Sequence, residues 1–153
     1  MPVGACVVGG RAVGVLKPGN HGSTFGGNPL ACTAVITTID AIREQGLLEN
    51  ALRVGKVIRE GLGAELAGLG GVAEIRGMGL MLGLQLERPC AELVKAALEA
   101  GLVVNVTADS VVRMLPPLVM NEAEGAMVVE RLAPLVKALL AREPSLPQAA
   151  AAR

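Results

Sequence analysis

Residues 19–31 read Gly19-Asn20-His21-Gly22-Ser23-Thr24-Phe25-Gly26-Gly27-Asn28-Pro29-Leu30-Ala31, and the rest of the chain is organised around them. Glycines let a backbone approach a ligand closely, and adjacent hydroxyl groups with free N–H groups suit a phosphate. Asn28 is a favourable N-cap and Pro29 a favourable first helical residue. The stretch therefore predicts a ligand-facing loop that leads into a helix. The alternative is a flexible glycine-rich surface loop. The stretch matches neither the P-loop pattern nor the dinucleotide fingerprint.

The composition excludes several classes of function. The 153 residues are 52% hydrophobic and 18% charged, with a formal net charge of zero, which is typical of a globular protein. Zero net charge argues against binding to nucleic acid or to an anionic membrane surface. One Phe is the only residue of the types Phe, Tyr and Trp, so a platform of aromatic side chains for base stacking is not available. The core must be built from aliphatic side chains.

Three cysteines, Cys6, Cys32 and Cys90, are widely spaced, and the chain has a single histidine. This arrangement does not match a zinc site, so no metal is expected. We interpret the cysteines as free, mostly buried thiols in a reducing compartment. No segment has the features of a signal peptide or the length of a membrane span, so we expect a cytoplasmic protein.

The first part of the chain predicts one strand and two helices. Residues 1–8 are typical of a short buried strand that ends at Gly9 and Gly10. Residues 28–45 predict a helix that stops at Gly46 and buries an apolar stripe of Ala31, Val35, Ile39 and Ile42, widened by Cys32 and Ile36. Residues 49–67 predict a second helix with a stripe of Val54, Ile58, Leu62 and Leu66. Both helices are interpreted as core and connector elements without chemistry.

From residue 72 onward the pattern predicts strand, strand, helix, strand, strand, helix. Leucines at 80, 82, 84 and 86 alternate with other residues, which indicates a strand with one face on a core. A helix over 89–100 should bury Leu93, Ala97 and Leu98, and strands should follow over 102–106 and 110–115. The last helix begins at Asn121 with a capping-box signature, and its stripe is Val128, Leu132, Val136 and Leu139. Pro134 predicts a kink or break in it. The order indicates an α+β domain with helices on one face of a sheet.

Arg113 is the strongest candidate for binding chemistry outside the glycine-rich loop, because it is the one charged residue in the apolar stretch 111–115. An unpaired guanidinium in an apolar strand is costly, which implies an anionic partner, and its fork suits a carboxylate. The alternative is an arginine that reaches solvent or forms a structural ion pair. His21 and Lys17 are interpreted as ordinary loop residues, the alternatives being a general base at His21 and a catalytic amine at Lys17. Asn28 is interpreted as a cap first and a site contact second. Paired carboxylates and a Ser-His-Asp arrangement are absent from the pattern.

Residues 22–31 resemble the phosphate-loop motif of the class III aminotransferases, which depend on pyridoxal 5'-phosphate. Residues 101–105 and 112–118 resemble a C-terminal signature of the same family, and the resemblance extends to about Leu140. It implies that Thr24 binds the cofactor phosphate of the partner subunit and that Ser23 lies at the substrate. It also implies that Arg113 binds a substrate carboxylate.

The resemblance implies an α/β, fold-type I protein. Residues 1–67 would be the C-terminal part of the cofactor-binding large domain with its connecting helices, 68–142 the small C-terminal α+β domain, and 143–153 a frayed tail. The Schiff-base lysine would lie upstream of Met1, so no catalytic residue is expected in this chain and the isolated chain should be inactive.

The implied reaction transfers an amino group between N2-acetylornithine and 2-oxoglutarate in arginine biosynthesis, in a homodimeric full-length enzyme. Other class III members, acting on ornithine, succinylornithine or 4-aminobutyrate, are one alternative. A non-catalytic module that keeps a phosphate-binding loop is another.

Overall fold

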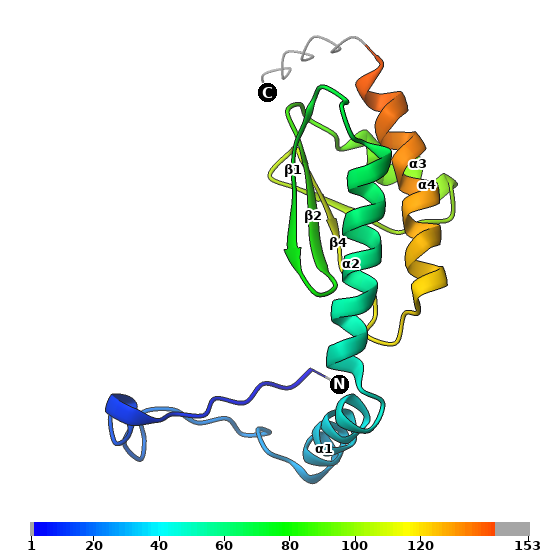
Figure 1. Cartoon of the computed structure of the whole chain (residues 1–153). Helices are drawn as coiled ribbons and strands as arrows, with labels where there is room; N and C mark the ends of the chain where they lie inside the picture. The colour runs from blue at the N-terminus through cyan, green and yellow to red at the C-terminus, as the bar shows by residue number, and fades with distance from the viewer. Residues whose placement is uncertain (1, 143–153) are drawn as a thin grey trace, which may run out of the picture. The chain divides into compact units, whose positions relative to one another are not determined.

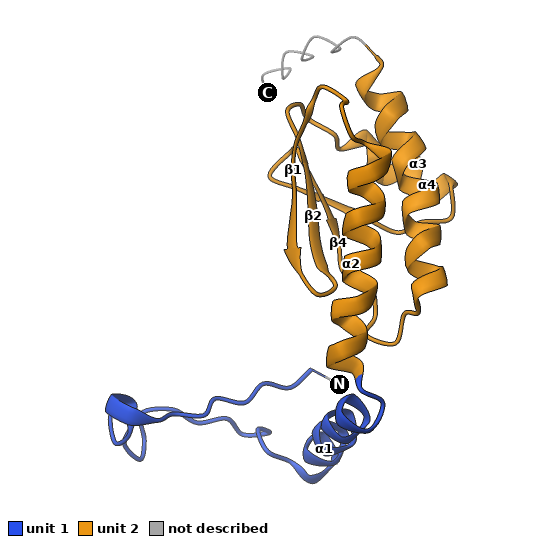
Figure 2. Cartoon of the chain, in the orientation of Figure 1, with its two compact units in different colours: residues 1–46 blue, residues 47–153 orange. Residues whose placement is uncertain are grey.

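The computed structural model describes residues 2–142, which fall into two compact units (Figure 2). The first unit is Met1–Gly46 and the second is Leu47–Arg153. The boundary places the helix that begins at Leu47 with the second unit. The assignment of 1–67 and 68–142 to the large and small domains of a longer protein stays a prediction.

The first unit contains a short 3-10 helix, η1 (Gly10–Ala12), and one α-helix, α1 (Pro29–Glu44). The strand predicted over 1–8 is wrong, because residues 2–8 form neither strand nor helix. A strand needs a partner for its backbone groups and a layer to cover its apolar side chains, and Val7 is 95% exposed. The apolar stripe of α1 is only partly buried for the same reason, since Ile36 and Ile39 are exposed.

The second unit is an antiparallel sheet covered on one face by helices. The strands are β1 (Val72–Met78), β2 (Met81–Leu86), β3 (Asn105–Thr107) and β4 (Val111–Met114), in the order β1-β2-β4-β3. The helices are α2 (Leu47–Glu65), α3 (Glu92–Glu99) and α4 (Glu122–Leu140). Figure 1 shows α2 and α4 side by side, and α2 also contacts β1 and β2. The predicted order of elements from residue 72 onward is confirmed.

One hydrophobic core lies between the sheet and these helices. The alternation predicted for the leucines of β2 is confirmed, because Leu82, Leu84 and Leu86 are almost fully buried while Met81 is exposed. The stripes predicted for the two long helices are also buried: Val54, Ile58, Leu62 and Leu66 in and just after α2, and Val128, Leu132, Val136 and Leu139 in α4. Each fully buried side chain of this size contributes about 1.5–3 kcal/mol relative to an exposed one.

The capping box at the start of α4 is confirmed. The Asn121 side chain accepts a hydrogen bond from the backbone of Glu124, and the backbone of Asn121 donates to the Glu124 carboxylate. Of the kink or break predicted at Pro134, the break is wrong, since α4 continues to Leu140. A proline removes one helical hydrogen bond, but buried residues on both sides of it, Leu132 and Val136, hold this helix against the core.

Two further expectations about burial are corrected. Leu98 is 63% exposed, because Leu93 and Ala97 are four residues apart on one helix face and Leu98 lies off that face. Cys6 and Cys32 are exposed free thiols, and only Cys90 is buried, since the first unit has no core to cover them. None of the helices in residues 2–142 is long and apolar enough to cross a membrane. The frayed tail predicted for 143–153 lies outside the described residues.

Candidate functional site

The glycine-rich loop before α1 is held by hydrogen bonds among its own residues. The Ser23 hydroxyl accepts a hydrogen bond from the Gly26 backbone N–H at 3.0 Å. The Asn28 side chain accepts from the Ala31 N–H at 3.0 Å and donates to the Phe25 carbonyl at 2.8 Å. Asn28 is therefore the N-cap that the sequence predicted, and it also fixes the turn in front of the helix.

Two glycines of this loop are required by the turn itself. A Cβ atom at Gly26 would lie 2.9 Å from the Cβ of Ser23, which is closer than such atoms approach one another. Gly27 has a φ of +74°, a conformation that L side chains rarely adopt. The backbone shape between Ser23 and Asn28 thus requires glycine at both positions. Together with the local hydrogen bonds, this argues for a defined loop over a merely flexible one.

The two hydroxyl groups of the loop are free to donate hydrogen bonds. Thr24 is exposed, and its side chain makes no hydrogen bond with any other residue in 2–142. Ser23 uses an oxygen lone pair for Gly26, so its own proton remains available. The loop precedes a helix of 16 residues, whose N-terminus carries partial positive charge. This set of donors suits a phosphate group.

The other polar residues of the loop make no comparable arrangement. The backbone of Lys17 donates to the Asn20 side chain at 2.7 Å, and the lysine is exposed. His21 is also exposed. Neither is held in a pocket, as a catalytic amine or general base would be.

Arg113 lies on β4, on the face of the sheet opposite the helices. Its strand neighbours Val112 and Met114 point into the core, so the alternation of the strand turns Arg113 outward. The expectation that its guanidinium is in apolar surroundings is therefore wrong for this chain, because the residue is exposed. Arg113 makes no hydrogen bond or ion pair with the residues that the structure describes. It is thus available for an external anion.

We call the face that carries Arg113 the open face. Register pairs Arg76 of β1 with Gly83 of β2, Gly83 with Arg113, and Arg113 with Asn105 of β3. Because paired residues share a face, these four form one row across the sheet. The strand residues of the open face are Glu74, Arg76, Met78, Met81, Gly83, Gln85, Asn105, Thr107, Val111 and Arg113.

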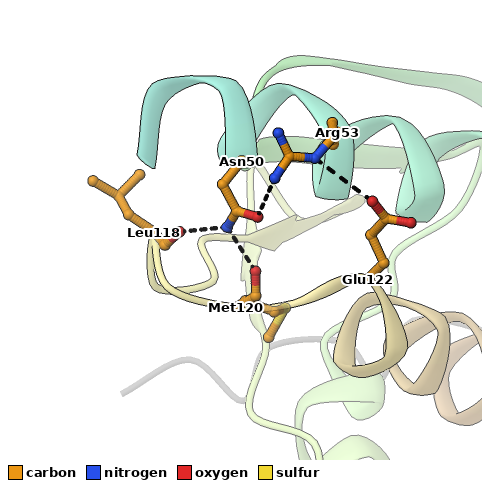
Figure 3. A network of polar contacts seen from close by, with 5 residues as sticks. All are labelled: Asn50, Arg53, Leu118, Met120 and Glu122. Carbon is orange, nitrogen blue, oxygen red and sulfur yellow. Dashed lines mark hydrogen bonds and ion pairs between the residues drawn. The ribbon is translucent and has the colours of Figure 1, made fainter. Parts of the chain in front are cut away.

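Asn50 of α2 fixes the loop that follows the Arg113 strand (Figure 3). Its side-chain amide donates to the carbonyl oxygens of Leu118 and Met120, both at 2.8 Å. Arg53 donates to the Asn50 side-chain oxygen at 3.2 Å and lies 3.6 Å from Glu122. No pattern in the residues of α2 indicates this role. A partner for Asn50 that is 68 residues away leaves no local signal in the sequence.

Ser23 and Thr24 belong to the first unit and Arg113 to the second. Among residues 2–142 no three His, Cys, Asp or Glu side chains lie close enough together to hold a metal ion.

Residues 1–136 match the family described as Aminotransferase class-III. The chain belongs to the class III aminotransferases. It is 51% identical over 143 residues to acetylornithine aminotransferase 1 of Bordetella bronchiseptica, covering 94% of this chain and 36% of that protein. It is 40% identical over 138 residues to the acetylornithine aminotransferase of Methanothermobacter thermautotrophicus, covering 90% and 35%. The chain thus spans about a third of the length of these relatives.

Solved structures of the class III family have the same architecture. The acetylornithine aminotransferase of Elizabethkingia anophelis superposes with a TM-score of 0.74 at 30% identity, over 81% of this chain and 32% of that one. The ornithine aminotransferase of Toxoplasma gondii superposes with a TM-score of 0.76 at 35% identity, over 82% and 31%. These neighbours confirm the expected α/β fold class, and the helices and small antiparallel sheet agree with it.

Proposed function

We propose that this chain is a segment of an acetylornithine aminotransferase, which transfers an amino group between N2-acetylornithine and 2-oxoglutarate. The observation that carries the proposal is the 51% identity to a relative of that name over a region that includes both candidate site segments. The unengaged donors of Thr24 and Arg113 support it, because the reaction needs contacts to a phosphate and to carboxylates. The same proposal includes a homodimeric, cytoplasmic full-length enzyme.

Class III aminotransferases depend on pyridoxal 5'-phosphate, which when bound supplies an electron sink for the amino-group transfer. In the proposed enzyme the Thr24 hydroxyl donates a hydrogen bond to the phosphate across the subunit interface. Ser23 contacts the substrate with its free hydroxyl proton. The Schiff-base lysine is supplied by a part of the enzyme outside this chain.

Arg113 binds a substrate carboxylate in this proposal. A guanidinium can hold both carboxylate oxygens through two parallel N–H bonds, which orients the substrate as well as retaining it. The clamp of Asn50 on Leu118 and Met120 supports this role, because it ties the chain after β4 to α2 and so limits movement of the strand end. Positioning of this kind lowers the entropic cost of reaching a reactive geometry.

Ornithine is a second candidate substrate, because several structural neighbours are ornithine aminotransferases, including that of Toxoplasma gondii. The two amino donors differ by an acetyl group, which removes the positive charge of one nitrogen. Single-turnover rates with N2-acetylornithine and with ornithine distinguish the candidates. The proposal expects the faster reaction with the acetylated donor.

The test uses a full-length hybrid in which this chain replaces the matching segment of the Bordetella bronchiseptica relative. Thr24→Val should weaken cofactor affinity by about 1–3 kcal/mol, since a charged acceptor loses one donor, and Thr37→Val on the exposed surface of α1 is its control. Arg113→Lys should slow the half-reactions with both substrates while cofactor loading stays normal, and the exposed Arg59→Lys is its control.

The two arms fail independently. Unchanged cofactor affinity in Thr24→Val would remove Thr24 from the phosphate site. Normal half-reaction rates in Arg113→Lys would make Arg113 a structural residue. A hybrid that loads the cofactor but transaminates neither donor would contradict the proposed reaction.

A further inference from the structure

The charges of the open face are distributed unequally. Two arginines, Arg76 and Arg113, lie in one row of paired residues. A single carboxylate, Glu74, lies in the neighbouring row. Arg76 donates to Glu74 at 3.0 Å and to the Gln85 side chain at 2.6 Å, whereas Arg113 has no partner in residues 2–142. Glu74 is the only acidic residue among the strand residues of this face. Its carboxylate is therefore committed to one arginine and withheld from the other.

The backbone between the two arginines carries no side chain. Gly83 lies between Arg76 and Arg113 in the row, and adjacent strands are about 4.8 Å apart, so the two backbone positions are roughly 10 Å from each other. Long side chains can cross that distance over the bare glycine. If Arg76 were missing, Arg113 would be the one remaining cation among the strand residues of the open face. Electrostatic attraction would then favour a Glu74 side chain that points toward Arg113.

We propose that Arg76 is a positioning residue that keeps Arg113 free for the substrate by holding Glu74. The inference rests on the proposed function, in which Arg113 binds a carboxylate. A carboxylate from the protein and one from the substrate have the same chemistry, so they compete for the same guanidinium. Arg76 holds the Glu74 carboxylate, so that it does not compete with the substrate for Arg113. The hydrogen bond to Gln85 fixes the orientation of the Arg76 guanidinium.

A structural role for the Glu74–Arg76 pair is the competing explanation. The two side chains are 58% and 44% exposed, and exposed ion pairs contribute little to stability. Removing the pair should therefore leave the fold intact. The stem of Arg76 does pack on the sheet, near the position where a Cβ of Gly83 would lie. A variant that keeps an unbranched apolar stem separates the charge from this packing.

The experiment compares Arg76→Met, Glu74→Gln and the double variant in the full-length hybrid. Arg76→Met should raise the KM for both substrates roughly threefold to tenfold with kcat little changed. In this variant the substrate carboxylate must first displace Glu74 from Arg113, and a partly exposed ion pair of this kind costs about that much to break. Glu74→Gln alone should have little effect, and the double variant should return to within about twofold of the parent. Arg76→Lys should lie near the parent, because it keeps a cation for Glu74. Lys137→Gln breaks an ion pair of 2.6 Å with Glu65, away from the sheet, and serves as the control.

A crystal structure of the 153-residue chain with Arg76→Met gives a readout that does not depend on activity. The proposal expects the Glu74 carboxylate within 4 Å of the Arg113 guanidinium. A double variant as impaired as Arg76→Met, an unchanged KM in Arg76→Met, or a Glu74 that stays away from Arg113 would each overturn it. If the Glu74–Arg113 contact forms but Arg113→Lys leaves both half-reactions normal, the carboxylate role of Arg113 fails and this inference fails with it for that separate reason.

Discussion

The two compact units differ in the interactions that order the chain. The second unit has a continuous core of side chains from α2, α3, α4 and the sheet. In the first unit Ala31 is the only buried apolar residue among those described, and Val7, Val13, Phe25 and Leu30 are all more than 60% exposed. The Ser23–Asn28 loop nevertheless has a defined shape, because its hydrogen bonds are local. Local bonds can therefore shape a glycine-rich loop in a unit where few of the described side chains are buried, but they do not bury a helix stripe.

The largest expected effect is the difference in stability between variants that truncate an isoleucine of each unit. Ile58 of α2 is 0% exposed and Ile39 of α1 is 42% exposed. Ile58→Ala should lower the free energy of unfolding by about 2–5 kcal/mol, because it removes buried methyl groups and leaves a cavity. Ile39→Ala should change it by less than about 0.5 kcal/mol. Urea unfolding followed by circular dichroism measures both.

Equal losses from the two isoleucines would contradict the division of the chain. A loss at Ile39 comparable with that at Ile58 would mean that the α1 stripe is covered as thoroughly as the α2 stripe.

A smaller effect is expected from two glycines of α2. A methyl group at Gly55 would overlap the carbonyl oxygen of Gly79, in the turn between β1 and β2, whereas nothing lies within 4 Å of a Cβ at Gly63. Gly55→Ala should destabilise the second unit by about 1–3 kcal/mol, because helix or turn must move. Gly63→Ala should stabilise it by about 0.5–1 kcal/mol, since alanine favours a helix.

Thermal unfolding measures both variants, and the melting temperature should fall in Gly55→Ala and rise in Gly63→Ala. A Gly55→Ala protein as stable as Gly63→Ala would show that the turn after β1 adapts without cost. The close approach of α2 to the sheet would then not depend on glycine.

The sequence predicted the second unit well because its signals are local and repeat. Alternation in β2, the stripes of α2 and α4 and the capping box at Asn121 each depend on residues a few positions apart. The strand over 1–8 was wrong because its apolar residues have the right composition but no layer to cover them. The helix does not break at Pro134, because packing on both sides of it outweighs one lost hydrogen bond.

The candidate site could be predicted only where its residues are exceptional in their own neighbourhood. Thr24 and Ser23 stand among glycines, and Arg113 stands alone in an apolar strand. The sequence could not show that Arg113 faces outward with no partner, because that depends on register with β2 and β3. The pairing of Arg76 with Gln85 and the clamp of Asn50 also depend on tertiary contacts, so they leave no pattern in the sequence.

The smallest expected effect on stability concerns the three thiols. Burial raises the pKa of Cys90 above its ordinary value of 9.0, whereas Cys6 and Cys32 are exposed. A raised pKa means that the folded chain holds this proton more tightly than the unfolded chain. The resulting stability is fully present below pH 9.0 and is lost as the pH rises through the folded pKa.

Thiol labelling at pH 8 sharpens the comparison of the units without a change in sequence. Only the thiolate reacts, and access to Cys90 requires opening of the core. Cys6 and Cys32 of the first unit should therefore react quickly with a maleimide, and Cys90 of the second unit should react only after addition of urea. A Cys90→Ala variant assigns the slow phase. Fast reaction of all three thiols in the native chain would mean that the core around Cys90 opens readily, and the contrast between the two units would then be one of degree.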